Sequence, residues 1–156
     1  MNGGRNEVFE RKWEELNDSM KKESTIHELK GKEFFNFLNR MVSNKGHFNK
    51  EDIIQALLVM SLNPIDYNLA ENLCTTFIES KDYEIKNLSI ISIGHIARVY
   101  KKLVDETLYN KVKELYFDKE SPFSETASDT LDDIQIFLGI QKPKSLSGDM
   151  NNDKDV

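Results

Sequence analysis

The residues best suited to chemistry lie together in one apolar stretch, IISIGHIARV, at residues 90–99. A histidine can transfer protons or bind a metal ion, and an arginine can bind an anion. Both side chains are costly to bury without a partner, and a glycine inside a helix costs ~1 kcal/mol relative to alanine. Gly94, His95 and Arg98 therefore belong to a catalytic site, to a metal site or to a packing device.

The rest of the sequence argues against the first two of these roles. His27, His47 and His95 fall in three separate segments, and the chain has neither an HxxxH motif nor a pair of cysteines. No serine or cysteine nucleophile in a loop accompanies His95, and nothing in the pattern indicates a defined cleft. We therefore expect a protein without enzymatic activity, bound metal or cofactor.

The composition narrows the class of partner. The 156 residues carry a net charge of −6, which disfavours binding to nucleic acid or to an anionic membrane and favours a basic partner. No apolar run reaches the ~20 residues that span a bilayer. The N-terminal stretch MNGGRNEVFERKWEEL has no apolar core typical of a signal peptide, so we expect a cytoplasmic protein. The single cysteine, Cys74, lies among apolar neighbours and is expected to be buried.

The hydrophobic pattern predicts an all-α fold, because no segment sustains the period-2 alternation of a strand. Asn49 and Asp105 are typical N-caps, and Gly139 is a typical residue for a helix C-terminus. The polar segment 143–156 is predicted to be a disordered tail after a single domain at 1–142. We expect about seven helices, near residues 5–22, 25–43, 50–62, 66–79, 83–102, 106–117 and 124–138.

Residues 66–139 contain an internal repeat with an offset of about 38 residues. At this offset Cys74 falls on Val112 and Ile93 falls on Leu131, so that apolar positions coincide. The repeated unit is a helix, a short turn near an aspartate and a second helix, and it resembles a HEAT repeat in which Asp82 caps the turn. The resemblance implies a short HEAT-like α-solenoid of stacked antiparallel helix pairs.

In a solenoid, equivalent positions of successive units become spatial neighbours. Gly94 then maps to Asp132, and His95 maps to Asp133. A glycine allows the two helices to approach closely, while His95 and Arg98 can pair with the two aspartates. We interpret these five residues as a structural latch between helices. The alternative is that His95, Arg98 and the aspartates also belong to a surface that binds a partner.

Two stretches resemble a narrower group, the small HEAT-like immunity proteins of bacterial toxin systems. GHIAR at 94–98 is similar to a GHLAR-like stretch of that family, and TLDDIQIFL at 130–138 is similar to its ALDDI-x-x-FL pattern, with Thr130 in place of alanine. The resemblance covers about 53–138 and leaves the first 50 residues unplaced. It implies an immunity protein of a contact-dependent growth inhibition or related polymorphic toxin system, which binds its cognate toxin 1:1 and occludes the active site.

Toxins of such systems are often nucleases, RNases among them, and an acidic protein can occupy their basic clefts. Acids at helix starts also stabilise the helix itself, so each candidate has a structural alternative. The competing function is a HEAT-like scaffold that joins other proteins; a repeat-fold DNA glycosylase would need a basic surface, which the net charge disfavours. The candidate toxin contacts are Asp105, Glu106, Asp118, Glu120, Glu125, Asp129 and the aromatic Tyr83.

Overall fold

The computed structural model describes residues 31–43 and 46–144, and all regular structure in these ranges is α-helical. The prediction of an all-α fold is thereby confirmed for this part of the chain. The predicted helix at 5–22, the start of the one at 25–43 and residues 145–156 of the predicted tail lie outside the described residues. The helices are α2 (Lys32–Val42), α3 (Lys50–Leu62), α4 (Tyr67–Phe77), α5 (Tyr83–Tyr100), α6 (Glu106–Phe117) and α7 (Ser124–Leu138).

Local signals in the sequence set the ends of these helices. Each of four N-cap side chains accepts a hydrogen bond from the backbone N–H three residues later, which satisfies a donor that the helix leaves unpaired. These N-caps are Asn49, Asp66, Asp82 and Asp105. At its C-terminal end, α7 stops at Gly139, whose φ of 72° lies in a region that favours glycine. The predicted roles of Asn49, Asp82, Asp105 and Gly139 are confirmed.

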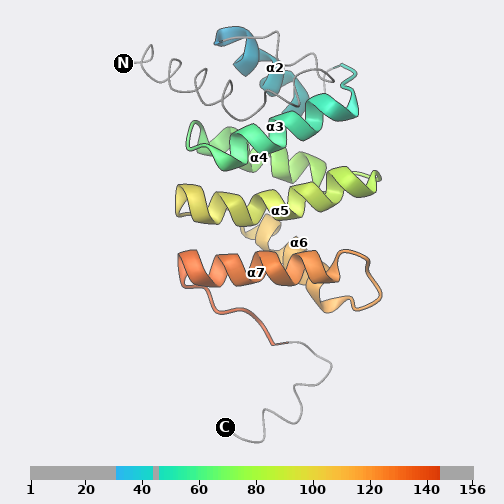
Figure 1. Cartoon of the computed structure of the whole chain (residues 1–156), viewed down its shortest axis with the longest axis vertical. Coiled ribbons are helices and arrows are strands. Elements are labelled where there is room, and N and C mark those ends of the chain that lie inside the picture. Colours follow the sequence, from blue (N-terminus) through green and yellow to red (C-terminus); the bar gives the residue numbers. More distant parts are fainter. Residues whose placement is uncertain (1–30, 44–45, 145–156) are drawn as a thin grey trace, which may run out of the picture.

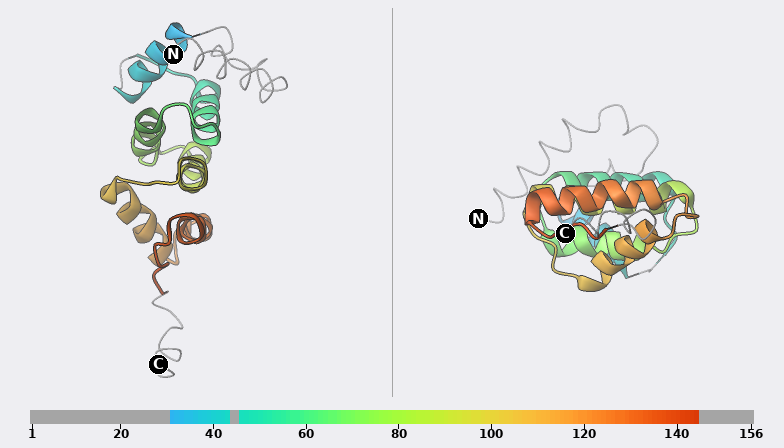
Figure 2. Two further views of the ribbon diagram at one scale, coloured as in Figure 1. Left: turned by 90° about the vertical axis from the view of Figure 1, so that its left-hand side faces the viewer. Right: turned by 90° about the horizontal axis from the view of Figure 1, so that it is seen from below.

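The helices form a stack of two layers. Figure 2 shows α3, α5 and α7 side by side in one layer and α4 and α6 in the other, with α2 packed on α4. Along the stack, α5 lies between α3 and α7, and it also contacts α4 (Figure 1). None of the described helices has the length and apolar character needed to cross a membrane.

The central position of α5 accounts for its apolar sequence. Ile90, Ile93 and Ile96 are fully buried, and so is Ala97. A helix with neighbours on three sides needs apolar side chains on three sides, so a single hydrophobic stripe would not suffice. The sequence of α5 therefore reads as apolar almost all round because the helix is an interior element of the stack.

Tyr100, at the end of α5, connects this helix by hydrogen bonds to the turn between α3 and α4. Its hydroxyl oxygen accepts hydrogen bonds from the backbone N–H groups of Ile65 and Asp66, at 3.2 and 3.3 Å. Its single proton has two carbonyl acceptors in reach, Asn63 O at 2.7 Å and Met60 O at 2.9 Å. One side chain thus satisfies polar groups of the irregular turn where α3 stops and α4 begins.

We expect Tyr100→Phe to destabilise the fold, because removal of the hydroxyl leaves backbone groups of a half-buried turn without their partner. The expected loss is about 1–3 kcal/mol in the free energy of unfolding. Urea denaturation followed by circular dichroism measures it. An unchanged free energy of unfolding would contradict a structural role for this hydroxyl.

Candidate functional site

Gly94, inside the stretch that the sequence singles out, lies in tight contact with Asp133 of α7. Gly94 is buried, and a Cβ atom placed on it would lie 2.7 Å from Oδ2 and 3.4 Å from Cβ of Asp133. Even the smallest side chain would force Asp133 to move. The absence of a side chain at position 94 therefore allows α7 to place this carboxylate directly against the backbone of α5.

Two threonines of α7 set the register of the same interface. The Thr130 hydroxyl donates to the carbonyl oxygen of Ile90 at 2.9 Å, and the Thr126 hydroxyl donates to Asn87 Oδ1 at 2.7 Å. Thr130 is almost fully buried. The sequence repeat aligned Gly94 with Asp132, whereas the structure places Asp133 against it and leaves Asp132 exposed.

His95 is half-buried beside this contact. Its Nδ1 atom is enclosed and has no hydrogen-bond partner among the described residues. Burial lowers the pKa of His95 below its ordinary value, the Arg98 guanidinium lowers it further, and the Asp133 carboxylate opposes both effects. Folding thus favours the neutral imidazole over the protonated form.

Of the pairs proposed for the latch, His95 and Asp133 interact through charge, but no salt bridge joins His95 to Asp132 or Asp133 within residues 31–43 and 46–144. Arg98 is exposed, and no salt bridge joins it to Asp132 or Asp133 in this part of the chain. Asp132 instead accepts a hydrogen bond from Lys142 Nζ at 2.8 Å. The same ammonium group donates to Ser128 Oγ, so the segment after α7 folds back onto that helix. Nothing in the local sequence marks Lys142 for this contact.

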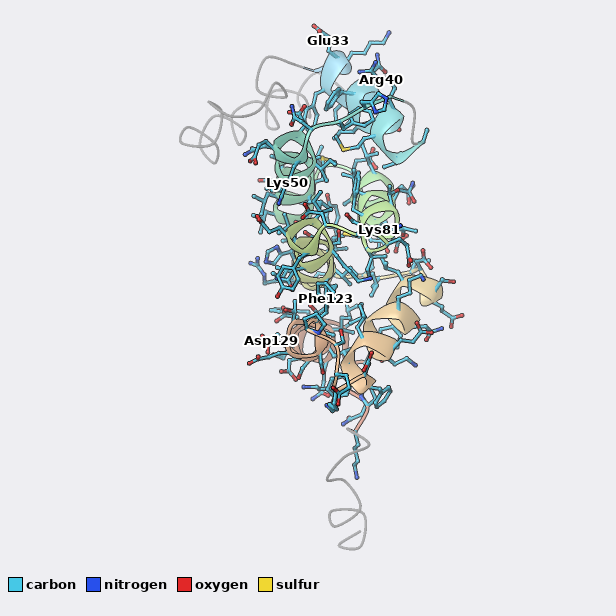
Figure 3. The ribbon with its side chains drawn as sticks, turned by 90° about the vertical axis from the view of Figure 1, so that its right-hand side faces the viewer. Glu33, Arg40, Lys50, Lys81, Phe123 and Asp129 are labelled. Atoms are coloured by element: carbon cyan, nitrogen blue, oxygen red, sulfur yellow. The ribbon has the colours of Figure 1, made fainter. Side chains whose placement is uncertain are left out.

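The outer face of α7 is acidic. The helix contains Glu125, Asp129, Asp132 and Asp133 and no lysine or arginine. The first three are exposed, and Asp133 is half-buried at the contact with α5. Figure 3 shows Asp129 on the outer side of the α3–α5–α7 layer, the side on which Lys50 lies. We call Glu125, Asp129 and Asp132 the acidic row.

The remaining candidate contacts are distributed over other parts of the fold. Asp105 is half-buried and caps α6, accepting from Leu108 N at 3.2 Å. Glu106 is exposed in the first turn of α6. Asp118 and Glu120 are exposed in the turn between α6 and α7, where the Asp118 carboxylate accepts from the backbone N–H of Glu120. The structure thus brings Glu125 and Asp129 together on one helix and leaves these four on α6 and its connection to α7.

Tyr83 belongs to a different feature of the same layer, an apolar groove between α3 and α5. The groove has a volume of about 280 Å³. Tyr83 is 53% exposed at its end and stacks on Phe123, with 5.0 Å between ring centroids. No pattern in the sequence distinguishes the other apolar side chains of the groove, which are Ile54, Leu58, Leu88 and Ile91.

Two further features bear on the chemistry available here. Cys74 is fully buried, as expected, and burial raises the pKa of its thiol. Within residues 31–43 and 46–144, no group of three or more histidine, cysteine, aspartate or glutamate side chains is arranged to hold a metal ion. What the described surface offers is an acidic row and an apolar groove.

No family model matches the chain, and neither a curated protein nor a solved structure matches it. The features of the chain that bear on its function are the residues of the α3–α5–α7 layer and the resemblance of residues 94–98 and 130–138 to immunity proteins.

We expect Gly94→Leu to destabilise the fold by about 1–3 kcal/mol through overpacking against Asp133, despite the better helix propensity of leucine. In an Asp133→Ala background the cost should fall by at least ~0.5 kcal/mol, because the carboxylate no longer occupies the space. Denaturant titration of the four proteins of this double-mutant cycle gives both values. Equal costs in the two backgrounds would show that Asp133 is not what limits side-chain size at position 94.

A second expectation concerns acid stability. Because the folded-state pKa of His95 lies below its unfolded value, the unfolded chain binds a proton more readily. The contribution of His95 to stability is therefore present above about pH 6.5 and is lost as the pH falls below it. His95→Gln should weaken the dependence of the free energy of unfolding on pH between about 7 and 5. A slope unchanged by His95→Gln would contradict this expectation.

Proposed function

We propose that the chain is an immunity protein that binds a cognate bacterial toxin in a 1:1 complex and neutralises it by covering its active site. The proposal takes the toxin to be a nuclease with a basic substrate cleft, an RNase among the candidates. Both proteins would meet in the cytoplasm of the producing cell. Two stretches support the proposal, because GHIAR at 94–98 and TLDDIQIFL at 130–138 each resemble a stretch of immunity proteins.

The single observation that carries the proposal is the acidic row. This 15-residue helix has no basic residue of its own and exposes three carboxylates along its outer face; Lys142 pairs with Asp132, which leaves Glu125 and Asp129 to carry the excess negative charge. A nuclease cleft is basic because it must hold a phosphate backbone. Complementary charges speed the encounter of two proteins and suppress binding of wrong partners. The acidic row is therefore suited to occupy the site that nucleic acid would otherwise fill.

The architecture that we propose for this role is a short HEAT-like α-solenoid, with α4–α5 and α6–α7 as two successive units. The direct contact between α5 and α7, the second helices of the two units, supports this assignment. In such an arrangement one layer of helices forms a continuous rigid surface. The acidic row and the groove would then lie on the same layer and face the same partner.

The test of the function is co-expression with the protein encoded by the adjacent upstream reading frame. We expect the upstream product to arrest growth, the present chain to restore it, and the purified proteins to form a 1:1 complex that lacks nuclease activity. Asp129→Lys should weaken that complex by about tenfold at low ionic strength, mainly through slower association. The matched control is Glu114→Lys, which makes the same charge change at an exposed position of α6.

Two outcomes would contradict the immunity function, and a third would contradict the role of the acidic row. Restoration of growth without a detectable complex would indicate an enzymatic antidote. An upstream product without toxicity would favour the scaffold function, in which the same surface joins other proteins. Equal weakening by Asp129→Lys and Glu114→Lys would show that net charge alone, rather than the acidic row, governs binding.

A further inference from the structure

The groove between α3 and α5 is an apolar surface that the fold leaves open. Ile54 and Leu58 line it from α3, and Leu88 and Ile91 line it from α5. All four are half-buried, so each contributes to packing between the helices and still presents carbon atoms to the groove. Apolar surface gathered in a concavity of a protein is a common feature of binding sites.

The end of this groove is held in place by aromatic contacts. Tyr83 stacks on Phe123, the residue before α7, and the Lys86 ammonium group lies 5.4 Å from the centroid of the Phe123 ring. Tyr83 is nevertheless 53% exposed, so its ring is fixed on one side and free on the other. A ring that is already ordered loses little conformational entropy when a partner covers it.

The charges next to the groove are mixed: Glu84 lines it, and the Lys86 ammonium group lies at the Phe123 end. Lys50 is the basic residue at its α3 end, and its ammonium group is shared by Asp82 at 3.1 Å and Glu84 at 3.0 Å. Two carboxylates thus surround one ammonium group. On the other side of α5 lies the acidic row of α7. An occupant of the groove therefore meets apolar walls at the centre and, across α5, the exposed carboxylates of Glu125 and Asp129 on α7, which are unfavourable for an acidic partner and favourable for a basic one.

We propose that this groove is the anchor site for a basic protein partner, which inserts an apolar side chain between α3 and α5 while flanking lysines or arginines contact the acidic row. The inference rests on the proposed function in that the partner is the same basic toxin. Neighbouring helices in a layer lie about 8–10 Å apart, so an anchor between α3 and α5 and cationic side chains that reach α7 must be separated by about one and a half such spacings. An amphipathic helix with an apolar stripe beside a basic one has this geometry.

The experiment uses the full chain and a synthetic helical peptide of about 18 residues, with leucines along one face and lysines on the rest. Isothermal titration calorimetry measures its affinity, and methyl NMR spectra locate its contacts. We expect shifts of the methyl signals of Ile54, Leu58, Leu88 and Ile91. Leu58→Lys should weaken binding by about tenfold or more through loss of apolar contact and charge repulsion.

Tyr83→Lys is a second variant at an exposed position and should weaken binding in the same direction. Val104→Lys places the same side chain at an apolar residue that is 69% exposed in the connection between α5 and α6, and it should leave the affinity within about twofold. A peptide with serine in place of leucine keeps the charge and should lose binding. A peptide with glutamate in place of lysine keeps the apolar face and should also lose it.

Several results would overturn the inference. Binding that survives both Leu58→Lys and Tyr83→Lys would place the peptide elsewhere, and binding that survives leucine-to-serine replacement would be purely electrostatic. The upstream toxin, where it forms the 1:1 complex, provides the second readout. A complex that neither variant weakens would refute the anchor site and leave the immunity function standing. Specific peptide binding without any toxin complex would support the anchor site and refute the immunity function.

Discussion

The close contact between α5 and α7 is the constraint on which the arrangement of the surface depends. It requires a residue without a side chain at position 94, because Asp133 occupies the space that a Cβ would need. Thr130 then reaches the carbonyl oxygen of Ile90, and Thr126 reaches Asn87. These directional bonds fix how far α7 is displaced along α5, which apolar packing alone would leave less well defined. The register of this interface in turn fixes where the acidic row lies relative to the groove on the other side of α5.

The sequence predicted the helices well because their ends carry local signals. Aspartate or asparagine caps and a terminal glycine act within a few residues, so the bounds of α3, α6 and α7 agree with those expected and α4 and α5 differ by at most two residues. The repeat offset was less informative about contacts. It aligned equivalent positions of two units, but side chains that touch across two packed helices depend on the stagger of the helices as well. Asp133, one residue further along, therefore lies against Gly94.

Two parts of the candidate site could not be predicted from the sequence, and each has a physical reason. Ile54 and Leu58 belong to a helix that is apolar on several faces, and residue type does not distinguish a side chain in the core from one at the edge of a groove; both are half-buried. Lys142 lies at the boundary of a segment that was predicted to be a tail, and its contact with Asp132 depends on the chain turning back after Gly139. Neither feature has a local sequence signal, because each is created when distant elements come together.

The groove and the acidic row would act at different stages of binding. At physiological ionic strength the Debye length is about 8 Å, so the acidic row influences a basic partner from a short distance before contact and loses much of its effect when salt is added. Burial of an apolar side chain acts only after the surfaces meet and slows dissociation. An immunity protein needs both properties, since it must reach the toxin before the toxin reaches its substrate and must then remain bound. The acidic row on α7 and the open groove between α3 and α5, held on one layer by the α5–α7 contact, provide a physical basis for this combination.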